Sequence, residues 1–212
     1  VRLKESKHAT EVIACSIGPK KCADTLKTAM AMGCDRSIHI ITDMRTDYMG
    51  LQPLSVAKIL QNVVMKEKAD LVLVGKQSID SDCGQTGPML AGLLGVPQIT
   101  FASKIVPTGD GLGLDVERET DAGTETINIS SLPAVISCDL RLNVPRYPKL
   151  KSIIAAKKKK IEKIVAEDMG IDLEPMNEVV EVYEPSAREA GVLVNNVDEL
   201  LDKLRNEASA IP

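Results

Sequence analysis

The sequence predicts a doubly wound α/β domain built on a mostly parallel β-sheet, and three features of its apolar pattern indicate this. Short runs rich in β-branched residues alternate with amphipathic segments of helical period between residues 10 and 95. Strands that alternate with helices at this spacing form parallel β-α-β units with right-handed crossovers. After Pro97 the apolar period changes to two, which predicts an antiparallel meander. The last part of the chain is poor in core-forming periodicity, which indicates an extended arm.

The first strands and helix are marked by turn and capping residues. TEVIACSIG (10–18) has the β-branched and small apolar residues of a buried strand. PKKCADTLKTAMAMG (19–33) follows as a helix, with Pro19 at its start and Gly33 as its stop. RSIHIIT (36–42) repeats the strand pattern and predicts the next strand of the sheet.

The pattern continues through the middle of the chain. PLSVAKILQNVVMKEK (53–68) and TGPMLAGLLG (86–95) have the apolar spacing of helices, and DLVLV (70–74) between them is a strand. The residues after Pro97 form the antiparallel meander, which spans 98–130 and precedes the last core strand at 133–140.

This pattern divides the chain into three regions. Residues 1–140 form the nucleotide-binding α/β domain, including the meander. Residues 141–165 are loop-like and rich in Pro and Lys, and residues 166–212 form an arm that ends in an amphipathic helix at VDELLDKLRNEASA. The chain opens without Met on VRLKESKH, which has the character of the end of a charged helix, so we expect the first strand of the sheet to be missing.

Composition narrows the classes of function. The 212-residue chain is 44% hydrophobic, which supports a real core, and its formal charge is −4 with only 2% aromatic residues. We therefore expect no nucleic-acid binding and no direct insertion into a membrane. The five cysteines lack the paired short spacing of a zinc or redox site, so we expect reduced thiols and no metal.

A loop crowded with small and polar residues spans 75–86. In an open parallel sheet, ligands bind outside the carboxyl ends of the strands, where this loop falls. Glycines at 75 and 84 let backbone N–H groups approach a ligand, and the following helix directs its positive end there, which favours a phosphate. Asp80 and Asp82 would cap turns or bind ribose hydroxyls. The same composition also suits a plain stable connection, since no Walker or G-x-G-x-x-G motif is present.

Catalytic chemistry is not indicated for this loop. A serine nucleophile such as Ser78 needs a nearby base, whereas His8 falls at an expected helix end and His39 inside a strand. We therefore expect no catalytic residue.

Three stretches resemble the β subunit of electron transfer flavoprotein: GKQSIDSDCGQTGPMLAGLLGVPQ, DLRLNVPRYPKLKSI and AAKKKKIE. The resemblance covers nearly the whole chain and implies an adenine-nucleotide hydrolase-like fold. It implies a subunit without covalent chemistry of its own, which pairs with an α subunit that binds most of the FAD. Electrons would pass from acyl-CoA and other flavin dehydrogenases to a membrane-bound quinone oxidoreductase.

The resemblance further implies that the loop wraps a structural AMP, with residues 84–86 nearest the phosphate. The contacts it implies are Ile17, Gly75, Lys76, Gln77, Ser78, Ile79, Asp80, Ser81, Asp82, Cys83, Gly84, Gln85 and Thr86. Ile17 stands where relatives often carry Cys, and a backbone contact would survive that change. Relatives also contact AMP through an N-terminal Asn-Pro segment, so we expect one wall of the site to be lost here.

The segment RYPKLKSIIAAKKKKIE predicts an exposed apolar knob with a basic rim. The alternative is that its apolar residues fold onto their own core and that the lysines at 157–160 form a solvated edge strand. The resemblance implies a recognition loop in which Leu150 anchors a dehydrogenase. Its apolar members are Tyr147, Leu150, Ile153 and Ile154. Glu119 matches an acidic residue that, in relatives, pairs with an arginine of the α subunit's flavin domain.

Two other functions remain open. One is an enzyme that uses the loop for ATP and Asp80 or Asp82 for magnesium, and the other is a stress-protein-like ATP-binding dimer. The resemblance places the protein in the mitochondrial matrix of a eukaryote or in the cytoplasm of a bacterium.

Overall fold

The computed structural model describes residues 1–45, 50–79, 81–109, 111–188 and 190–212. It divides into two compact units, Val1–Val179 and Val180–Pro212. The first unit begins with a short helix α1 (Arg2–Glu5) and contains every strand of the described residues. None of the described helices combines the length and apolar composition needed to cross a bilayer.

The first sheet has three parallel strands in the order β1-β2-β8. They are β1 (Ile13–Gly18), β2 (Arg36–Ile41) and β8 (Glu162–Val165). Helices cover both faces of this sheet. Alternate residues of β2 point to opposite faces, so its contacts identify the helix on each side. Ile38 and Ile40 pack with Ile59 of α3 (Pro53–Glu67), while Ser37 contacts Met30 of α2 (Cys22–Ala31). The expected α/β architecture is confirmed for this part of the chain.

The second sheet has five strands in the order β3-β7-β4-β5-β6. They are β3 (Leu71–Gly75), β7 (Ala134–Cys138), β4 (Gln98–Pro107), β5 (Leu114–Thr120) and β6 (Gly123–Ile129). The pairs β3–β7 and β7–β4 are parallel, and β4, β5 and β6 form the expected antiparallel meander. Helix α4 (Thr86–Leu94) packs on β7 through Leu90 and Ala91.

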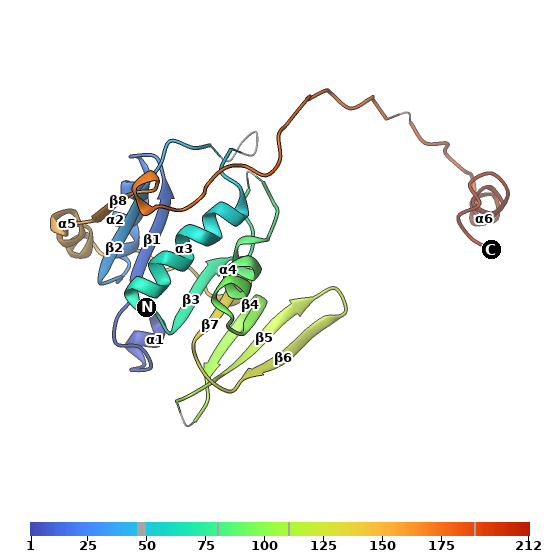
Figure 1. Cartoon of the computed structure of the whole chain (residues 1–212). Coiled ribbons are helices and arrows are strands. Elements are labelled where there is room, and N and C mark those ends of the chain that lie inside the picture. Colours follow the sequence, from blue (N-terminus) through green and yellow to red (C-terminus); the bar gives the residue numbers. More distant parts are fainter. Residues whose placement is uncertain (46–49, 80, 110, 189) are drawn as a thin grey trace. The chain divides into compact units, whose positions relative to one another are not determined.

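The parallel strands thus form two hydrogen-bonded groups rather than one continuous sheet. Within the described residues β1 and β3 share no ladder, and each is an edge strand of its own sheet. Helix α3 joins the two groups: Ile59 and Val63 pack in the core beneath β1 and β2, and Ala57 packs with Leu90 and Val135. Figure 1 shows α3 and α4 side by side across the strands.

Strand β4 takes part in both the parallel core and the meander, which the period-two pattern alone did not predict. Its first residues pair parallel with β7, and its later residues pair antiparallel with β5. The register with β7 shifts between Ile99 and Ala102, and the register with β5 shifts between Ala102 and Lys104. Phe101 lies in the first of these intervals, and its φ of 60° is in the left-handed region. A bulge of this kind turns a strand from one partner to the next.

The expectation that residues 141–165 are loop-like was wrong for two elements. A helix, α5 (Leu150–Lys158), and strand β8 lie there, after a short 3₁₀ turn η2 (Leu140–Leu142). The lysines obscured the helix, although Lys157 and Lys158 occupy its last turn, where cations are favourable. Lys157 and Lys158 are therefore helical, and the edge strand begins only at Glu162.

The first compact unit extends beyond β8 through a second 3₁₀ turn, η3 (Glu167–Met169). Ala166 and Leu173 are buried in the core that α3 forms with β2. Ser55 donates to the carbonyl of Leu173, and Gln52 donates to the carbonyl of Asn177. The arm expected from residue 166 onward therefore shares its first residues with this unit.

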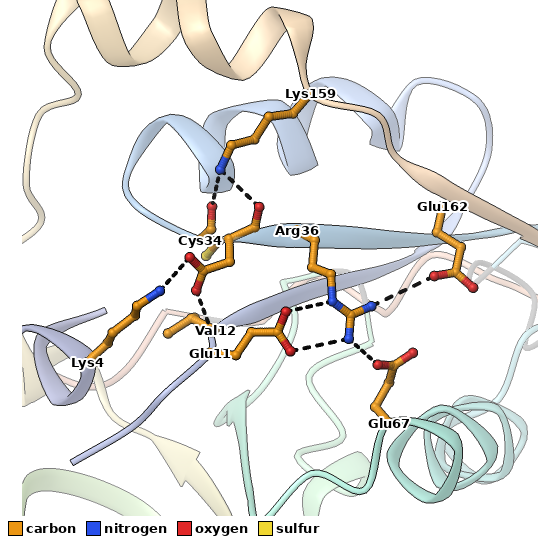
Figure 2. A network of polar contacts seen from close by, with 9 residues as sticks. Lys4, Glu11, Val12, Cys34, Arg36, Glu67, Lys159 and Glu162 are labelled. Atoms are coloured by element: carbon orange, nitrogen blue, oxygen red, sulfur yellow. Dashed lines mark hydrogen bonds and ion pairs between the residues drawn. The ribbon is translucent and has the colours of Figure 1, made fainter. Parts of the chain in front are cut away.

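An ionic network ties together the edge of the first sheet where β2 begins (Figure 2). Arg36 bonds Glu11 with an Nε–Oε1 distance of 2.8 Å and also pairs with Glu67 at the end of α3 and Glu162 of β8. Nearby, Lys159 donates to the carbonyl oxygens of Cys34 and Asp35. These contacts link segments far apart in the sequence, and the ion pairs of the partly exposed Arg36 are each of modest energy.

The second unit contains helix α6 (Val197–Asn206), in agreement with the amphipathic pattern. Asn196 caps it by accepting from the N–H of Glu199, and the Glu199 carboxylate accepts from the N–H of Asn195. This reciprocal capping fixes the start of the helix. Val197 and Leu200 remain exposed in the chain by itself.

Candidate functional site

The loop between β3 and α4 lines a cavity of about 320 Å³ at the carboxyl end of β3. A volume near 300 Å³ is at the lower end for small-ligand pockets. The cavity is lined by Pro53, Val74, Gly75, Lys76, Gln77, Ser78, Ser81, Cys83, Gly84, Gln85 and Thr86. Helices α3 and α4 begin at Pro53 and Thr86, so two positive helix ends border the cavity.

Hydrogen bonds within the loop give it a defined shape. The N–H of Asp82 donates to the carbonyl of Ser78 at 2.9 Å, and the hydroxyls of Ser78 and Ser81 lie 3.1 Å apart. The amide of Gln77 donates to the carboxylate of Asp82. Gly84 has a φ of 62°, and a Cβ there would lie 3.4 Å from the carbonyl oxygen of Lys76. Glycine therefore suits this position, where the loop passes close to its own backbone at Lys76.

Most of the predicted loop residues gather around the cavity. Among the described residues, Ile79 points fully into solvent, while Asp82 and Ile17 do not line the cavity. Asp80 lies outside the described residues. Pro53 and Val74 also line the cavity, although neither was among the predicted site residues. Proline at the start of a helix that follows a parallel strand was the available signal for Pro53.

Lys76 is held in place at the cavity wall. Its Nζ lies 3.0 Å from Oδ2 of Asp139 and 5.9 Å from the centre of the Phe101 ring. The Asp139 carboxylate also accepts from the N–H of Arg141 at 3.1 Å. This N–H bond and the Lys76 ammonium lower the pKa of Asp139, so its carboxylate is ionised at neutral pH.

Glu119 on β5 is paired within the chain. Its Oε2 lies 2.7 Å from an Nη of Arg141, whose Nε is 3.9 Å from Asp139. The Arg141 side chain is 68% exposed, so this pair is open to solvent. A partner's cation would have to compete with Arg141 for Glu119.

The predicted partner-facing residues separate into two groups. Tyr147, Leu150 and Ile154 are exposed, and Leu150 opens helix α5 with 73% of its surface accessible. Ile153 instead packs inward against the cluster formed by Met30, Ala31 and Ala156. Both readings of the sequence therefore apply: part of the segment forms an exposed apolar surface and part folds onto the core.

The two histidines lie in other contacts. His39 is buried, with its Nε2 3.1 Å from the carbonyl of Gly18, and His8 is exposed beside Ser6. Neither is among the residues that line the cavity. The described lining offers backbone groups, hydroxyls, amides and one ammonium, which are groups that bind and orient a ligand.

Comparison with known proteins gives a consistent result. Residues 1–169 match the family described as electron transfer flavoprotein domain. The chain is 52% identical over 211 residues to the electron transfer flavoprotein subunit beta, mitochondrial, of Oryza sativa subsp. japonica, covering 100% of this chain and 82% of that relative. It is 51% identical over 206 residues to the electron transfer flavoprotein subunit beta of Homo sapiens, covering 97% of this chain and 79% of the relative.

Proposed function

The chain belongs to the electron transfer flavoprotein family and is homologous to its beta subunits, and from this premise we propose that it is the β half of a flavoprotein heterodimer that carries electrons. In this role it holds a structural AMP, supports the FAD of the α subunit and docks dehydrogenases. Its plant relatives are named mitochondrial, and we place the protein in the mitochondrial matrix.

The observation that carries the AMP proposal is the cavity formed by the loop at 75–86. It lies at the carboxyl end of a parallel strand, where α/β folds bind nucleotides. The N-terminus of α4 at Thr86 and the glycine at 84 would receive the phosphate, because both present backbone N–H groups without bulky side chains. The hydroxyls of Ser78 and Ser81 would receive the ribose.

Support for an α-subunit partner comes from the second compact unit taken by itself. It carries large apolar side chains that are mostly exposed: Val180, Val182, Tyr183, Val192 and Leu193. Exposed apolar residues in such number indicate a surface that another protein covers. Of the region 166–212, we assign the part in this unit, Val180–Pro212, to packing on the α subunit, and we assign Glu119 to an arginine of that subunit.

Dehydrogenase docking is assigned to the exposed surface of α5. Leu150, Ile154 and the preceding Tyr147 provide the apolar contact, and the lysines around them provide a basic rim. This surface of α5, with Tyr147 before it, takes the place of the recognition loop expected within residues 141–165. From the same heterodimer, electrons would pass to the quinone oxidoreductase.

Reconstitution tests the proposal. The protein is mixed with an α subunit of the family and FAD, and the complex is isolated by size-exclusion chromatography with detection of flavin absorbance. We expect a one-to-one heterodimer with bound FAD that accepts electrons from an acyl-CoA dehydrogenase. A stable protein that forms no flavin-bearing heterodimer, or that hydrolyses ATP in the presence of Mg²⁺, would contradict it.

A further inference from the structure

Lys76 and Asp139 are brought together by the register of two parallel strands. Gly75 and Cys138 are paired at the ends of β3 and β7, so the next residue of each strand emerges at the same edge of the sheet. The N–H of Lys76 donates to the carbonyl of Cys138, which continues the ladder to this point. The two side chains then meet at 3.0 Å.

Asp139 neutralises the charge of Lys76 at the wall of the cavity. Lys76 has the one charged side chain among the described residues that line it. Asp139 is nearly buried, with 5% of its side chain exposed, and its carboxylate faces Lys76 directly. The neighbouring Arg141 is paired with Glu119, so these two cations and two carboxylates together are neutral.

We propose that Asp139 sets the charge selectivity of this cavity, so that it accepts a nucleoside monophosphate and disfavours a triphosphate. The inference rests on the proposed nucleotide site. A monophosphate needs little more than the N–H groups of the loop and of α4. A triphosphate brings about two more negative charges, and the ammonium that would stabilise them is already neutralised by Asp139.

Coulomb's law gives the size of the effect. At roughly 10 Å and an effective dielectric constant of about 40, in low salt, one unit charge alters the affinity for another about two- to fourfold. A triphosphate carries about two more charges than a monophosphate, and the effects on the two charges multiply. Removing the Asp139 charge should therefore shift the ratio of triphosphate to monophosphate affinity by about fivefold in favour of the triphosphate. The shift should decrease at high ionic strength, because the interaction is screened.

The experiment is a competition between AMP and ATP without divalent metal. The protein is equilibrated with an equimolar mixture, separated from free ligand, and denatured, and the two nucleotides are quantified by chromatography. Asp139→Asn removes the carboxylate charge and keeps an acceptor for the N–H of Arg141. Lys76→Met is the opposing variant, because it leaves the Asp139 charge unpaired. Asp115→Asn, on the exposed start of β5, is the matched control for loss of one carboxylate charge.

We expect the natural protein to retain AMP over ATP, Asp139→Asn to shift the bound ratio about fivefold toward ATP, and Lys76→Met to shift it toward AMP. Asp115→Asn should leave the ratio unchanged. If Asp139→Asn does not fold, Lys76→Met alone decides, and an unchanged ratio overturns the inference. A protein that binds AMP and whose ratio is unaffected by these variants contradicts the role of Asp139 but leaves the proposed function intact. A protein that binds neither nucleotide contradicts the proposed function itself.

Discussion

Replacing Leu150 by alanine tests the docking surface most sharply, because the side chain is already exposed in the free chain. With 73% of Leu150 accessible, a partner can bury most of it. Complete burial of a leucine contributes roughly 1.5–3 kcal/mol, so Leu150→Ala should cost about 1–2 kcal/mol of binding. We therefore expect the Kd for an acyl-CoA dehydrogenase to rise about fivefold to thirtyfold.

The assay is surface plasmon resonance or calorimetry with the reconstituted heterodimer, combined with thermal unfolding. Met65→Ala is the control, since Met65 on α3 is 66% exposed and lies outside the proposed surface. It should leave both binding and stability nearly unchanged. Leu150→Ala should weaken binding without lowering the unfolding temperature, because no core contact is lost. Unchanged dehydrogenase affinity, or a loss of stability comparable to that of a buried leucine, would refute the assignment.

Three further predictions concern stability and reactivity. Ile59→Ala should lower the free energy of unfolding by about 2–5 kcal/mol in urea, because Ile59 is fully buried where α3 packs on the first sheet; a smaller loss would contradict this packing. Hydrogen bonds from the Arg141 N–H and Lys76 lower the pKa of Asp139 in the folded chain, and those from Lys4 and the Val12 N–H lower the pKa of Asp35. The stability that these two carboxylates contribute to the fold should therefore be present above pH 3.8, their ordinary pKa, and be lost as the pH falls below it. Urea unfolding as a function of pH should therefore show a steeper acid limb in the natural protein than in Asp139→Asn. Burial raises the pKa of Cys15 to about 11, so labelling by maleimide at pH 8, followed by mass spectrometry, should be more than about a hundredfold slower than for free cysteine.

Much of the fold follows from local patterns in the sequence. The helix that begins at Pro53 and the one that begins at Thr86 were predicted because their apolar residues recur at helical spacing. The loop at 75–86 was identified because small and polar residues interrupt two apolar runs. Most of its members line the cavity, since consecutive residues of a short loop share one edge of the sheet.

The features that escaped prediction depend on contacts between distant segments. The pairing of Lys76 with Asp139 requires β3 and β7 to be neighbours, and 63 residues separate the two side chains along the chain. Helix α5 was not predicted because its exposed lysines and leucine are also typical of a loop. Only two of its residues, Ile153 and Ala156, belong to the apolar cluster that it forms with α2. The double role of β4 depends on the bulge at Phe101, which no residue preference indicates.

The most direct test of the nucleotide proposal is the identity of the ligand in the native complex. The heterodimer is purified without added nucleotide, the ligand is released by heat, and the supernatant is analysed by mass spectrometry. We predict AMP at about one molecule per β chain. Absence of any nucleotide from a complex that still holds FAD, or recovery of a triphosphate in place of AMP, would contradict the account.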